Sequence, residues 1–454
     1  MVSLMAPLNS SMVAVALPDI RHDLGVGVGA LTWLISGYLI AVVATQPVAG
    51  RLGDAYGHSR IVLIGLAGLI VTSLVGALAW SFPVLVAART LQGVAAGCAA
   101  PNAIAALRAR IPADRLTAAL GRNGAATNAG AALGPAVGGL LLVAGDWRWL
   151  FFANIPVAVV AALLVLQLPR VSIPRRAAAI DFFSVAAVTL FFTALTIIGV
   201  GVRIHNVPLV VASAVASLAI LAAYGERYRR SRLGVVDLRL FSRRDYAAAA
   251  FSSALANMAF YTVFFSIPVY LADVRHRGDA VVAMTLLVTS LTSTCVSPFS
   301  GRIAARFGTL RPIITGAGLL LFAMALLAGM LDGPPIVLLL VPMALVGIAL
   351  GLSGAPQQGL ALRAWPATVA GSASGTYSMM RYVGSISGTA IAAGMLGAHP
   401  GEERFRALFA VLAVVALANL AVVIAGRSRT TSGSGEDAEL SPLAVTPGPS
   451  PAVR

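Results

Sequence analysis

Long apolar runs separated by short polar segments make up nearly the whole chain. A membrane-spanning helix needs about 20 mostly apolar residues, and runs of this kind recur from the first residues to residue 426. They lie near 2–18, 29–50, 61–80, 84–107, 117–143, 149–168, 182–201, 207–225, 247–272, 280–300, 311–331, 335–355, 367–394 and 405–426. The pattern predicts an all-α integral membrane protein with fourteen transmembrane helices.

The composition supports a membrane location. Of the 454 residues, 58% are hydrophobic and 11% are charged, whereas a soluble domain carries about a quarter charged residues. The chain therefore cannot bury its apolar surface against itself alone, and a bilayer must be part of its solvent. Cys98 and Cys295 both lie within apolar runs, where small core residues are expected.

The positive charges are distributed unevenly between the loops. The 32 cationic side chains are all arginines and give a formal net charge of +15. Such a balance can indicate nucleic-acid binding, but here the arginines cluster between apolar runs. With both termini in the cytoplasm, 23 arginines fall inside and 7 outside, while Arg89 and Arg381 lie within spans. This split follows the positive-inside rule, so we expect fourteen crossings, cytoplasmic termini and no nucleic-acid partner.

One polar segment occurs twice. Residues 50–60, GRLGDAYGHSR, follow the second apolar run, and residues 301–311, GRIAARFGTLR, follow the tenth. The second copy keeps the glycines and flanking arginines but has Ala305 where the first has Asp54. A weaker echo relates GVAAGCAAP in the fourth run to GIALGLSGAP in the twelfth. Two six-helix halves with two inserted helices explain this arrangement, which parallel-repeat transporters can use.

The repeat divides the chain into four parts. We expect an N-terminal six-helix bundle over 1–168, two inserted helices with a basic cytoplasmic loop over 169–245, and a C-terminal six-helix bundle over 246–427. Residues 428–454 are rich in Ser, Gly, Pro and Thr, a composition that does not form a packed core. This last part is predicted to be a disordered cytoplasmic tail.

Six short motifs, collinear along the chain, carry a family resemblance. They are LNSSMVAVALPDI (8–20), GRLGDAYGHSR (50–60), RTLQGVAAG (89–97), GAALGPAVGG (130–139), WRWLFFANIPVAV (147–159) and RYVGSISGTAI (381–391). Together they resemble the major facilitator superfamily, in its fourteen-helix drug:proton antiporter branch of multidrug and antibiotic efflux proteins. The resemblance covers nearly the whole chain. It implies a transporter of the bacterial plasma membrane that works by alternating access.

The first copy of the repeated segment is a candidate gate. Gly50 and Gly57 allow tight turning and close helix approach. Asp54 is expected near the start of the third helix, where the helix dipole favours an anion, among arginines such as Arg51 and Arg60. The resemblance implies that Asp54 helps to latch the two halves together on the cytoplasmic side, and that this latch breaks as the carrier turns inward.

Arg89 is a charge within an apolar run. Placing a charge near the bilayer centre costs roughly 3 kcal/mol even on permissive scales, so Arg89 must face protein or a wet cavity. Snorkelling to the outer headgroups is the alternative, because Trp80 and Pro83 are close in sequence. The resemblance assigns the matching arginine to proton coupling, with Gln92 one turn further along the helix.

The segment GAALGPAVGG suggests a closely packed helix. Gly130, Gly134 and Gly138 are four residues apart and fall on one helical face, where small residues let two helices approach closely in lipid. Pro135 bends the helix, and Gly139 completes the motif. The resemblance implies that this segment lies against the other half and favours export by limiting leak. The alternative is that the glycines serve helix packing alone.

Polar residues within the apolar runs are candidates for a central cavity between the halves. They are Asn9, Gln46, Asn128, Asn257, Tyr261, Gln357, Gln358, Tyr377 and Arg381. For any one of them alone, an interhelical hydrogen bond is the commoner role. Asn9 stands where related chains usually place an aspartate, and no acidic residue lies deep in any predicted span.

Three explanations of energy coupling stay open without that aspartate. Coupling uses Arg89 together with an acid at a helix end, such as Asp19 or Asp54, or the substrate carries the exchanged charge, or another driving force operates. An acid-free cavity that holds an arginine suits a neutral or anionic substrate better than a cationic drug.

The predicted function is secondary active export of small amphipathic molecules, such as an antibiotic or another secondary metabolite, with the proton gradient as the energy source. The chain has no G-x-x-x-x-G-K-[ST] segment and no metal-site or nucleophile–base pattern. We therefore expect no enzyme activity, cofactor or metal. The expected partners are a small-molecule substrate, protons and the lipid bilayer, and the expected state is a monomer. A solute uptake carrier and a non-transporting membrane sensor are the alternatives.

Overall fold

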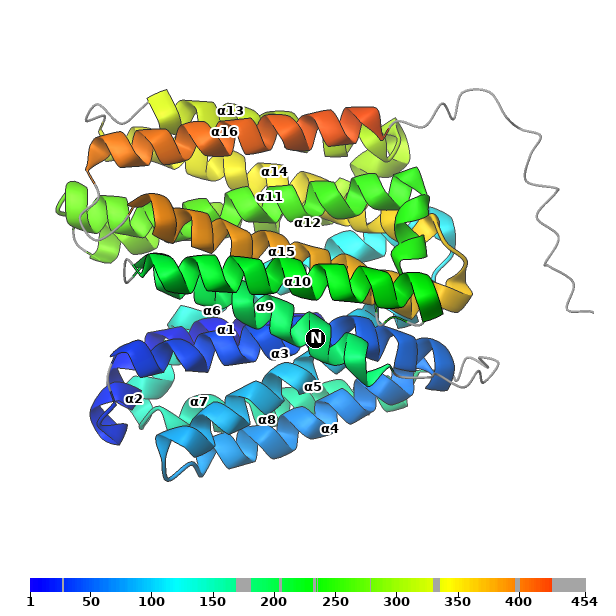
Figure 1. Cartoon of the computed structure of the whole chain (residues 1–454), viewed down its shortest axis with the longest axis horizontal. Helices are drawn as coiled ribbons and strands as arrows, with labels where there is room; N and C mark the ends of the chain where they lie inside the picture. Colours follow the sequence, from blue (N-terminus) through cyan, green and yellow to red (C-terminus); the bar gives the residue numbers. More distant parts are fainter. Residues whose placement is uncertain are drawn as a thin grey trace, which may run out of the picture.

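The structure is a computed structural model that describes residues 1–26, 28–168, 181–203, 206–231, 234, 236–277, 279–329, 335–396 and 401–426. Long helices run side by side through the described part (Figure 1). They are α1 (Val2–Val15), α2 (Leu17–Leu24), α3 (Val28–Tyr56), α4 (His58–Ala77), α5 (Phe82–Arg110), α6 (Ala113–Ala144), α7 (Arg148–Phe152), α8 (Asn154–Leu166), α9 (Phe182–Arg203), α10 (Val207–Ser231), α11 (Arg244–Val269), α12 (Asp279–Phe307), α13 (Leu310–Gly329), α14 (Ile336–Arg363), α15 (Ala370–Leu396) and α16 (Glu402–Ala425). The 3₁₀ turns η1 (Leu238–Ser242) and η3 (Ala367–Val369) and the π-helical turn η2 (Tyr270–Val274) lie between them. The predicted tail, residues 428–454, lies outside the described residues.

Each of the fourteen predicted apolar runs lies on a helix or on two consecutive helices. The first run is divided between α1 and α2, and the sixth between α7 and α8. Within the described ranges, nine helical segments are long and apolar enough to cross a membrane by length and composition. Helices α12 and α15 are less apolar because Gly, Ser and Thr dilute their apolar residues. The all-helical membrane fold is confirmed, and the number of crossings stays a prediction.

The helices pack in two groups. In the first group, α3 and α4 pack on α5, α1 packs on α6, and α8 packs on α4. In the second group, α12 and α13 pack on α14, α11 packs on α15, and α16 packs on α13. Figure 1 shows the first group in blue and cyan at the bottom and the second group in yellow and orange at the top.

Helices α9 and α10 lie across the boundary between the two groups (Figure 1). Helix α9 packs against α3 of the first group and α15 of the second, and α10 packs on α9. The contact buries Val188 and Phe192 of α9 with Val43 of α3 and Ile386 of α15. This hairpin therefore covers one side of the seam between α3 and α15.

The two groups approach each other closely at one end of the molecule. Gly50 on α3 faces Gly371 on α15 so closely that a Cβ on either residue would overlap the backbone of the other. Gly121 on α6 likewise stands against the backbone of Ser297 on α12. These contacts lie toward the C-terminal ends of α3 and α12 and the N-terminal ends of α6 and α15. We call this end the latch end.

The two copies of the repeated segment form the same structure. In each copy the helix continues past the apolar run, to Tyr56 in α3 and to Phe307 in α12. A single glycine then makes the turn, with φ of 99° at Gly57 and 86° at Gly308, a region that glycine enters without the steric penalty of a side chain. Of the two glycines expected to allow tight turning, only Gly57 makes a turn. The rest of residues 50–60 is helical, because polar residues continue a helix readily once it leaves an apolar run.

Candidate functional site

Asp54 lies in the last turn of α3 and connects the two groups of helices. Its Oδ1 accepts a hydrogen bond from the Gly371 N–H at 2.7 Å, and its Oδ2 accepts bonds from the N–H and the hydroxyl of Ser372 at 2.8 and 2.6 Å. Gly371 and Ser372 open α15, where backbone N–H groups lack helical partners and the helix dipole is positive. Asp54 therefore caps α15 and not, as expected from the sequence, the third helix. We call these three bonds the latch.

His58, the first residue of α4, packs behind Asp54. It is 3% exposed, and its Nε2 lies 3.7 Å from Oδ1 of Asp54. Its Nδ1 lies 3.1 Å from Oδ1 of Asn102 on α5. Among the described residues, the basic side chain within 4 Å of the Asp54 carboxylate is His58, and neither Arg51 nor Arg60 forms an ion pair with it. The expected arginine surroundings of Asp54 are thus replaced by a buried imidazole and an amide.

The second copy of the repeat makes the corresponding contact without an acid. Gly301 on α12 lies against the backbone of Ala118 on α6, so closely that a Cβ would overlap it. Ala305 occupies the place of the carboxylate. Nearby, Arg363 at the end of α14 donates a hydrogen bond to the Thr117 hydroxyl at 3.0 Å. Close packing and a neutral hydrogen-bond acceptor therefore join the groups here.

Arg89 on α5 is the centre of a buried polar cluster and is 1% exposed. Its Nη1 donates to Oδ1 of Asn9 at 3.1 Å and to Oε1 of Gln92 at 3.0 Å, and its Nε donates to the Leu34 carbonyl at 3.5 Å. The guanidinium lies 4.5 Å from the centroid of the Tyr38 ring, within range of a cation–π interaction. This burial contradicts the snorkelling alternative.

The cluster around Arg89 contains amides and hydroxyls. Asn154 on α8 donates to Oδ1 of Asn9 at 3.2 Å, and Gln92 donates to the Ser73 hydroxyl on α4 at 2.9 Å. Within the described structure, no carboxylate forms an ion pair with Arg89. Neutral dipoles and an aromatic ring therefore hold the charge, and the sequence-based pairing with Asp19 or Asp54 is not formed.

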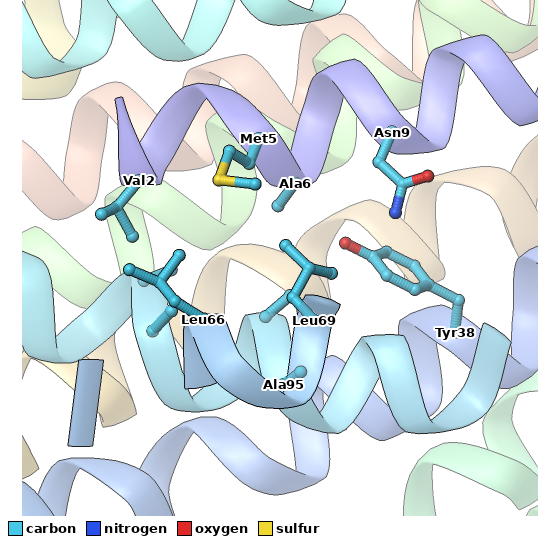
Figure 2. A pocket seen from close by; sticks show the side chains of 11 residues that line it. Val2, Met5, Ala6, Asn9, Tyr38, Leu66, Leu69 and Ala95 are labelled. Carbon is cyan, nitrogen blue, oxygen red and sulfur yellow. The ribbon is translucent and has the colours of Figure 1, made fainter. Parts of the chain in front are cut away.

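Asn9 belongs to this cluster rather than to a cavity between the two groups. It lines a small, mostly apolar cavity enclosed by α1, α3, α4 and α5, with about 10 Å³ available to the centre of a water molecule. That volume holds about one water. Figure 2 shows the Asn9 amide and the Tyr38 hydroxyl on one side of this cavity, with Leu66 and Leu69 facing α1. The structure therefore places Asn9 inside the first group, whereas the sequence led us to expect it in the central substrate cavity between the groups.

The glycines of GAALGPAVGG pack within the first group. A Cβ at Gly130 would meet the Leu4 backbone, one at Gly134 would overlap Ser11, and one at Gly138 would meet Met12, all on α1. The expectation that this face lies against the other half is therefore corrected.

Gly139 does not share the close helix contact made by the other three glycines. A Cβ at Gly139 would meet no atom within 4 Å. The side chain of Pro135 lies outside the described side chains.

Two predicted cavity residues do lie where the groups meet. Asn128 on α6 donates a hydrogen bond to the Ser293 hydroxyl on α12 at 2.8 Å. Gln46 on α3 is buried against Gly375 of α15, and its Oε1 has no hydrogen-bond partner among the described residues. Gln358 on α14 is also buried, and its Nε2 likewise lacks a partner there.

Two others are engaged within the second group. Gln357 donates to the Ser252 hydroxyl at 2.8 Å, and that hydroxyl in turn donates to Asn419 at 2.6 Å. Asn257 donates to the Ser253 carbonyl of its own helix at 2.8 Å. The structure therefore does not bring Gln357 together with the residues at the boundary.

Arg381 lies halfway along α15 among tyrosines. Tyr261 of α11 and Tyr377 and Tyr382 of α15 are within electrostatic range of its guanidinium. Tyr382 also packs against Tyr38 of α3. A cation with tyrosines of α11 and of its own helix in its neighbourhood thus stands at the boundary between the two groups.

Two of the carboxylates near helix ends pair with an arginine of another helix. At the end opposite the latch end, Asp23 accepts hydrogen bonds from Trp147 at 3.0 Å and Arg148 at 3.1 Å, and the Trp147 bond foremost lowers the pKa of Asp23. At the latch end, Asp181 accepts two bonds from Arg227, which lower the pKa of Asp181 to about 2. Both pairs tie neighbouring helix ends together.

The sequence reasoning missed several residues of the site. His58 lies within the repeated segment, but a single histidine there carries no signal of its own. Asn102, Gly371 and Ser372 carry no motif of their own, although the small residues of GSASG at the start of the thirteenth run indicate a closely approached helix end. Tyr38 had no signal beyond its place in an apolar run.

A sequence profile of the Major Facilitator Superfamily matches residues 1–389. The chain belongs to the Major Facilitator Superfamily. Multidrug resistance protein Stp of Mycobacterium tuberculosis (strain CDC 1551 / Oshkosh) is 31% identical over 402 residues, which cover 86% of this chain and 73% of that protein. The tetracenomycin C resistance and export protein of Streptomyces glaucescens is 29% identical over 415 residues, which cover 88% and 75%. The uncharacterized MFS-type transporter YwoD of Bacillus subtilis (strain 168) is 29% identical over 422 residues, which cover 91% of each chain.

Solved structures of superfamily transporters share the fold. The human organic anion transporter MFSD10 aligns with a TM-score of 0.68 and 16% identity, covering 93% of this chain and 97% of that one. The proton:xylose symporter XylE aligns with a TM-score of 0.62 and 13% identity, covering 91% and 92%. At these identities the likeness concerns the fold alone.

The resemblance drawn from the sequence motifs is confirmed. The chain is a multi-pass membrane transporter of the superfamily, and its relatives include proteins named for multidrug resistance and antibiotic export. As a member of a family of transporters that bind small molecules, it is not an enzyme.

Proposed function

We propose that this superfamily transporter is a proton-driven exporter of small amphipathic molecules in the bacterial plasma membrane. The names of two relatives, a multidrug resistance protein and a tetracenomycin C export protein, support export of such compounds. The observation that carries the proposal is the latch, in which Asp54 of the first group caps α15 of the second. A contact between rigid groups, confined to one end, is the element that alternating access requires.

The energetics suit a reversible latch. A hydrogen bond to a charged group contributes about 1.5–3 kcal/mol, so three such bonds hold the groups firmly without making separation prohibitive. One proton moving down a potential of about 100 mV releases about 2.3 kcal/mol, and a pH difference of one unit adds about 1.4 kcal/mol. A single proton per cycle therefore matches the scale of the work.

The arginine distribution orients the transporter. The loops at the latch end hold most of the arginines, and by the positive-inside rule this supports a cytoplasmic position for this end and for both termini. The closed latch then corresponds to a carrier that is shut toward the cytoplasm. Breaking the latch gives the substrate access from inside, as export requires.

The boundary between the groups favours neutral or anionic aromatic substrates. Arg381 with Tyr261, Tyr377 and Tyr382 offers a positive charge and aromatic rings, which suit a planar phenolate or carboxylate. The described acidic residues lie at helix ends and in connections rather than beside this cluster. A lipophilic cation would meet Arg381 without an acid to offset the repulsion.

Compound accumulation in energised cells tests this proposal. Cells that express the chain are compared with empty-vector cells for matched panels of anionic, neutral and cationic aromatic compounds, with and without an uncoupler. Anionic and neutral compounds are expected to accumulate less, and the uncoupler is expected to abolish the difference. Selective export of cations would contradict the substrate class, and uncoupler-insensitive export would contradict proton coupling. Raised accumulation would show an uptake carrier.

A further inference from the structure

We propose that His58 and Asp54 form a proton-binding site within the latch, and that a proton bound there favours opening of the latch end. The proposal rests on the latch function proposed above. It adds a proton site that lies outside the Arg89 cluster and outside the substrate boundary. The ligand is a proton taken from water on the latch side.

The tautomer of neutral His58 follows from its partner. Asn102 donates its Nδ2 to the carbonyls of Ala49 at 2.8 Å and Cys98 at 2.9 Å. Because only the amide nitrogen can donate, the amide orientation is fixed, and Oδ1 of Asn102 is left facing Nδ1 of His58 at 3.1 Å. Nδ1 must therefore carry a hydrogen and donate it. The unprotonated position of the neutral ring is Nε2.

That open position faces a carboxylate. Nε2 of His58 lies 3.7 Å from Oδ1 of Asp54. Asp54 accepts bonds from two backbone N–H groups, which can only donate, and from the Ser372 hydroxyl, so it is ionised in the closed latch. A lone pair on Nε2 thus points toward an anionic oxygen. A proton on Nε2 converts this repulsion into an imidazolium–carboxylate pair.

The His58–Asn102 pair is buried, and a glycine beside it leaves the space that it needs. His58 is 3% exposed and Asn102 is fully buried. Gly53 makes the pairing sterically feasible, because a Cβ there would overlap Oδ1 of Asn102 and would lie 2.6 Å from Nδ1 of His58.

Charged groups reach His58 from two of the packed helices. Asp54 faces it from α3 and favours its protonation, whereas Arg110 faces it from α5 and opposes protonation. Arg110 is held by bonds to the Ser59 hydroxyl at 3.0 Å and the Ala106 carbonyl at 3.0 Å. Helix α15 contributes the neutral donors of Gly371 and Ser372.

Opening of the latch removes hydrogen-bond donors from Asp54, and this determines which state the proton favours. In the closed latch, three donors from α15 share the charge of Asp54. When the groups separate, the carboxylate loses these donors, and the proton shared with His58 becomes its main partner. The open state therefore binds the proton more tightly, and by linkage the proton shifts the population toward the open state. For one proton, the open-to-closed ratio rises by at most about tenfold for each unit that the pH falls.

The second repeat lacks three residues of this site. Ala304, Ala305 and Thr309 occupy the positions of Gly53, Asp54 and His58. Thr309→His is therefore a matched control, because it adds an imidazole at the equivalent turn with no carboxylate beside it.

The test measures a distance across the latch end as a function of pH. In a Cys98→Ala/Cys295→Ala background, Tyr56→Cys and Ala367→Cys carry spin labels on exposed positions of opposite groups. Double electron–electron resonance spectroscopy on the full-length protein in nanodiscs gives the open-to-closed ratio between pH 5.5 and 8.5. No substrate and no proton gradient are present. We expect the open fraction to rise as the pH falls, and Thr309→His to behave like the unmodified chain.

His58→Gln is expected to abolish the pH dependence while leaving the latch bonds of Asp54 in place. If this variant fails to fold, His58→Asn serves the same purpose, and size-exclusion profiles identify the folded one. A wild-type ratio independent of pH, or a full pH dependence in the folded His58 variant, would overturn the proposal. This experiment does not measure export. Export that is insensitive to an uncoupler would therefore contradict proton-driven transport without contradicting the proton site.

Discussion

The carboxylate of Asp54 accepts three hydrogen bonds from the start of α15, whereas Ala305, its counterpart in the second repeat, has no polar side chain to offer. The two copies therefore share a backbone shape, with a left-handed glycine after each helix, but only one copy carries the charge. The consequence is a carboxylate cap on a helix start at the first copy and an alanine at the equivalent position of the second.

Asp54→Asn should impair export strongly. An amide keeps the volume but loses the charge, and one of its two polar atoms becomes a donor that faces N–H groups of α15. Loss of about 1.5–3 kcal/mol for a charged hydrogen bond corresponds to a shift of about tenfold or more in the closed population. Initial export rates, normalised to the amount of protein in the membrane, measure the effect. Ala305→Asp is the matched comparison and should change the rate little. Equal loss in both variants would show that the asymmetry has no functional weight.

Arg89 is a second residue whose surroundings lead to a prediction. Its Nη1 serves Asn9 and Gln92 at once while the plane of the group faces Tyr38, a geometry that lysine cannot reproduce. Arg89→Lys should therefore lose export nearly as completely as Arg89→Gln, with normal membrane levels. Arg311→Lys, at an exposed position, controls for the loss of guanidinium chemistry in general. Full activity of Arg89→Lys would show that a positive charge alone is sufficient.

At the scale of helices, the sequence predicted the apolar runs well because each must match the thickness of the bilayer. The ends of the helices were harder to predict: α3 continues to Tyr56 and α12 to Phe307 through polar residues that look like loop. The cap on α15 could not be predicted, because the partners of Asp54 include backbone N–H groups, which leave no mark in the sequence. The same limit applies to GAALGPAVGG, where the glycine spacing showed a close helix contact but not that α1 is the partner.

The packing of α6 on α1 gives a prediction at this scale. A Cβ at Gly134 would overlap Ser11 and lie 3.0 Å from the Leu8 carbonyl, so Gly134→Leu should force the two helices apart. Overpacking typically costs about 1–3 kcal/mol, which should lower the melting temperature in detergent by several degrees. Gly139→Leu, five residues further along, meets no atom within 4 Å and should leave the melting temperature unchanged. A similar loss at both positions would point to glycine flexibility rather than to the α1 contact.

At the scale of the whole molecule, the closest described backbone approaches between the two groups share one feature. The latch, the Gly50–Gly371 approach and the Gly121–Ser297 approach all lie toward the same end. The α9–α10 hairpin covers the α3–α15 seam. The arrangement is that of two helix groups in close backbone contact at the latch end, with the hairpin covering one side of their seam.

A crosslink between the two groups should therefore stop transport. Asn128 and Ser293 join α6 to α12 through a hydrogen bond of 2.8 Å, so cysteines at both positions, in the Cys98→Ala/Cys295→Ala background, can form a disulfide. Oxidation should suppress export in membrane vesicles, and a reductant should restore it, because opening of the latch end needs α6 and α12 to separate. The reduced protein is its own baseline for the two substitutions.

The matched control places cysteines at Ser252 and Asn419, which bond at 2.6 Å within the second group. That crosslink should leave export intact, because each group moves as a unit. Full export from the oxidised Asn128→Cys/Ser293→Cys protein would mean that the groups do not separate at the latch end, and alternating access through this end would be refuted. Loss of export in both crosslinked proteins would instead place the essential motion inside a group, between α11 and α16.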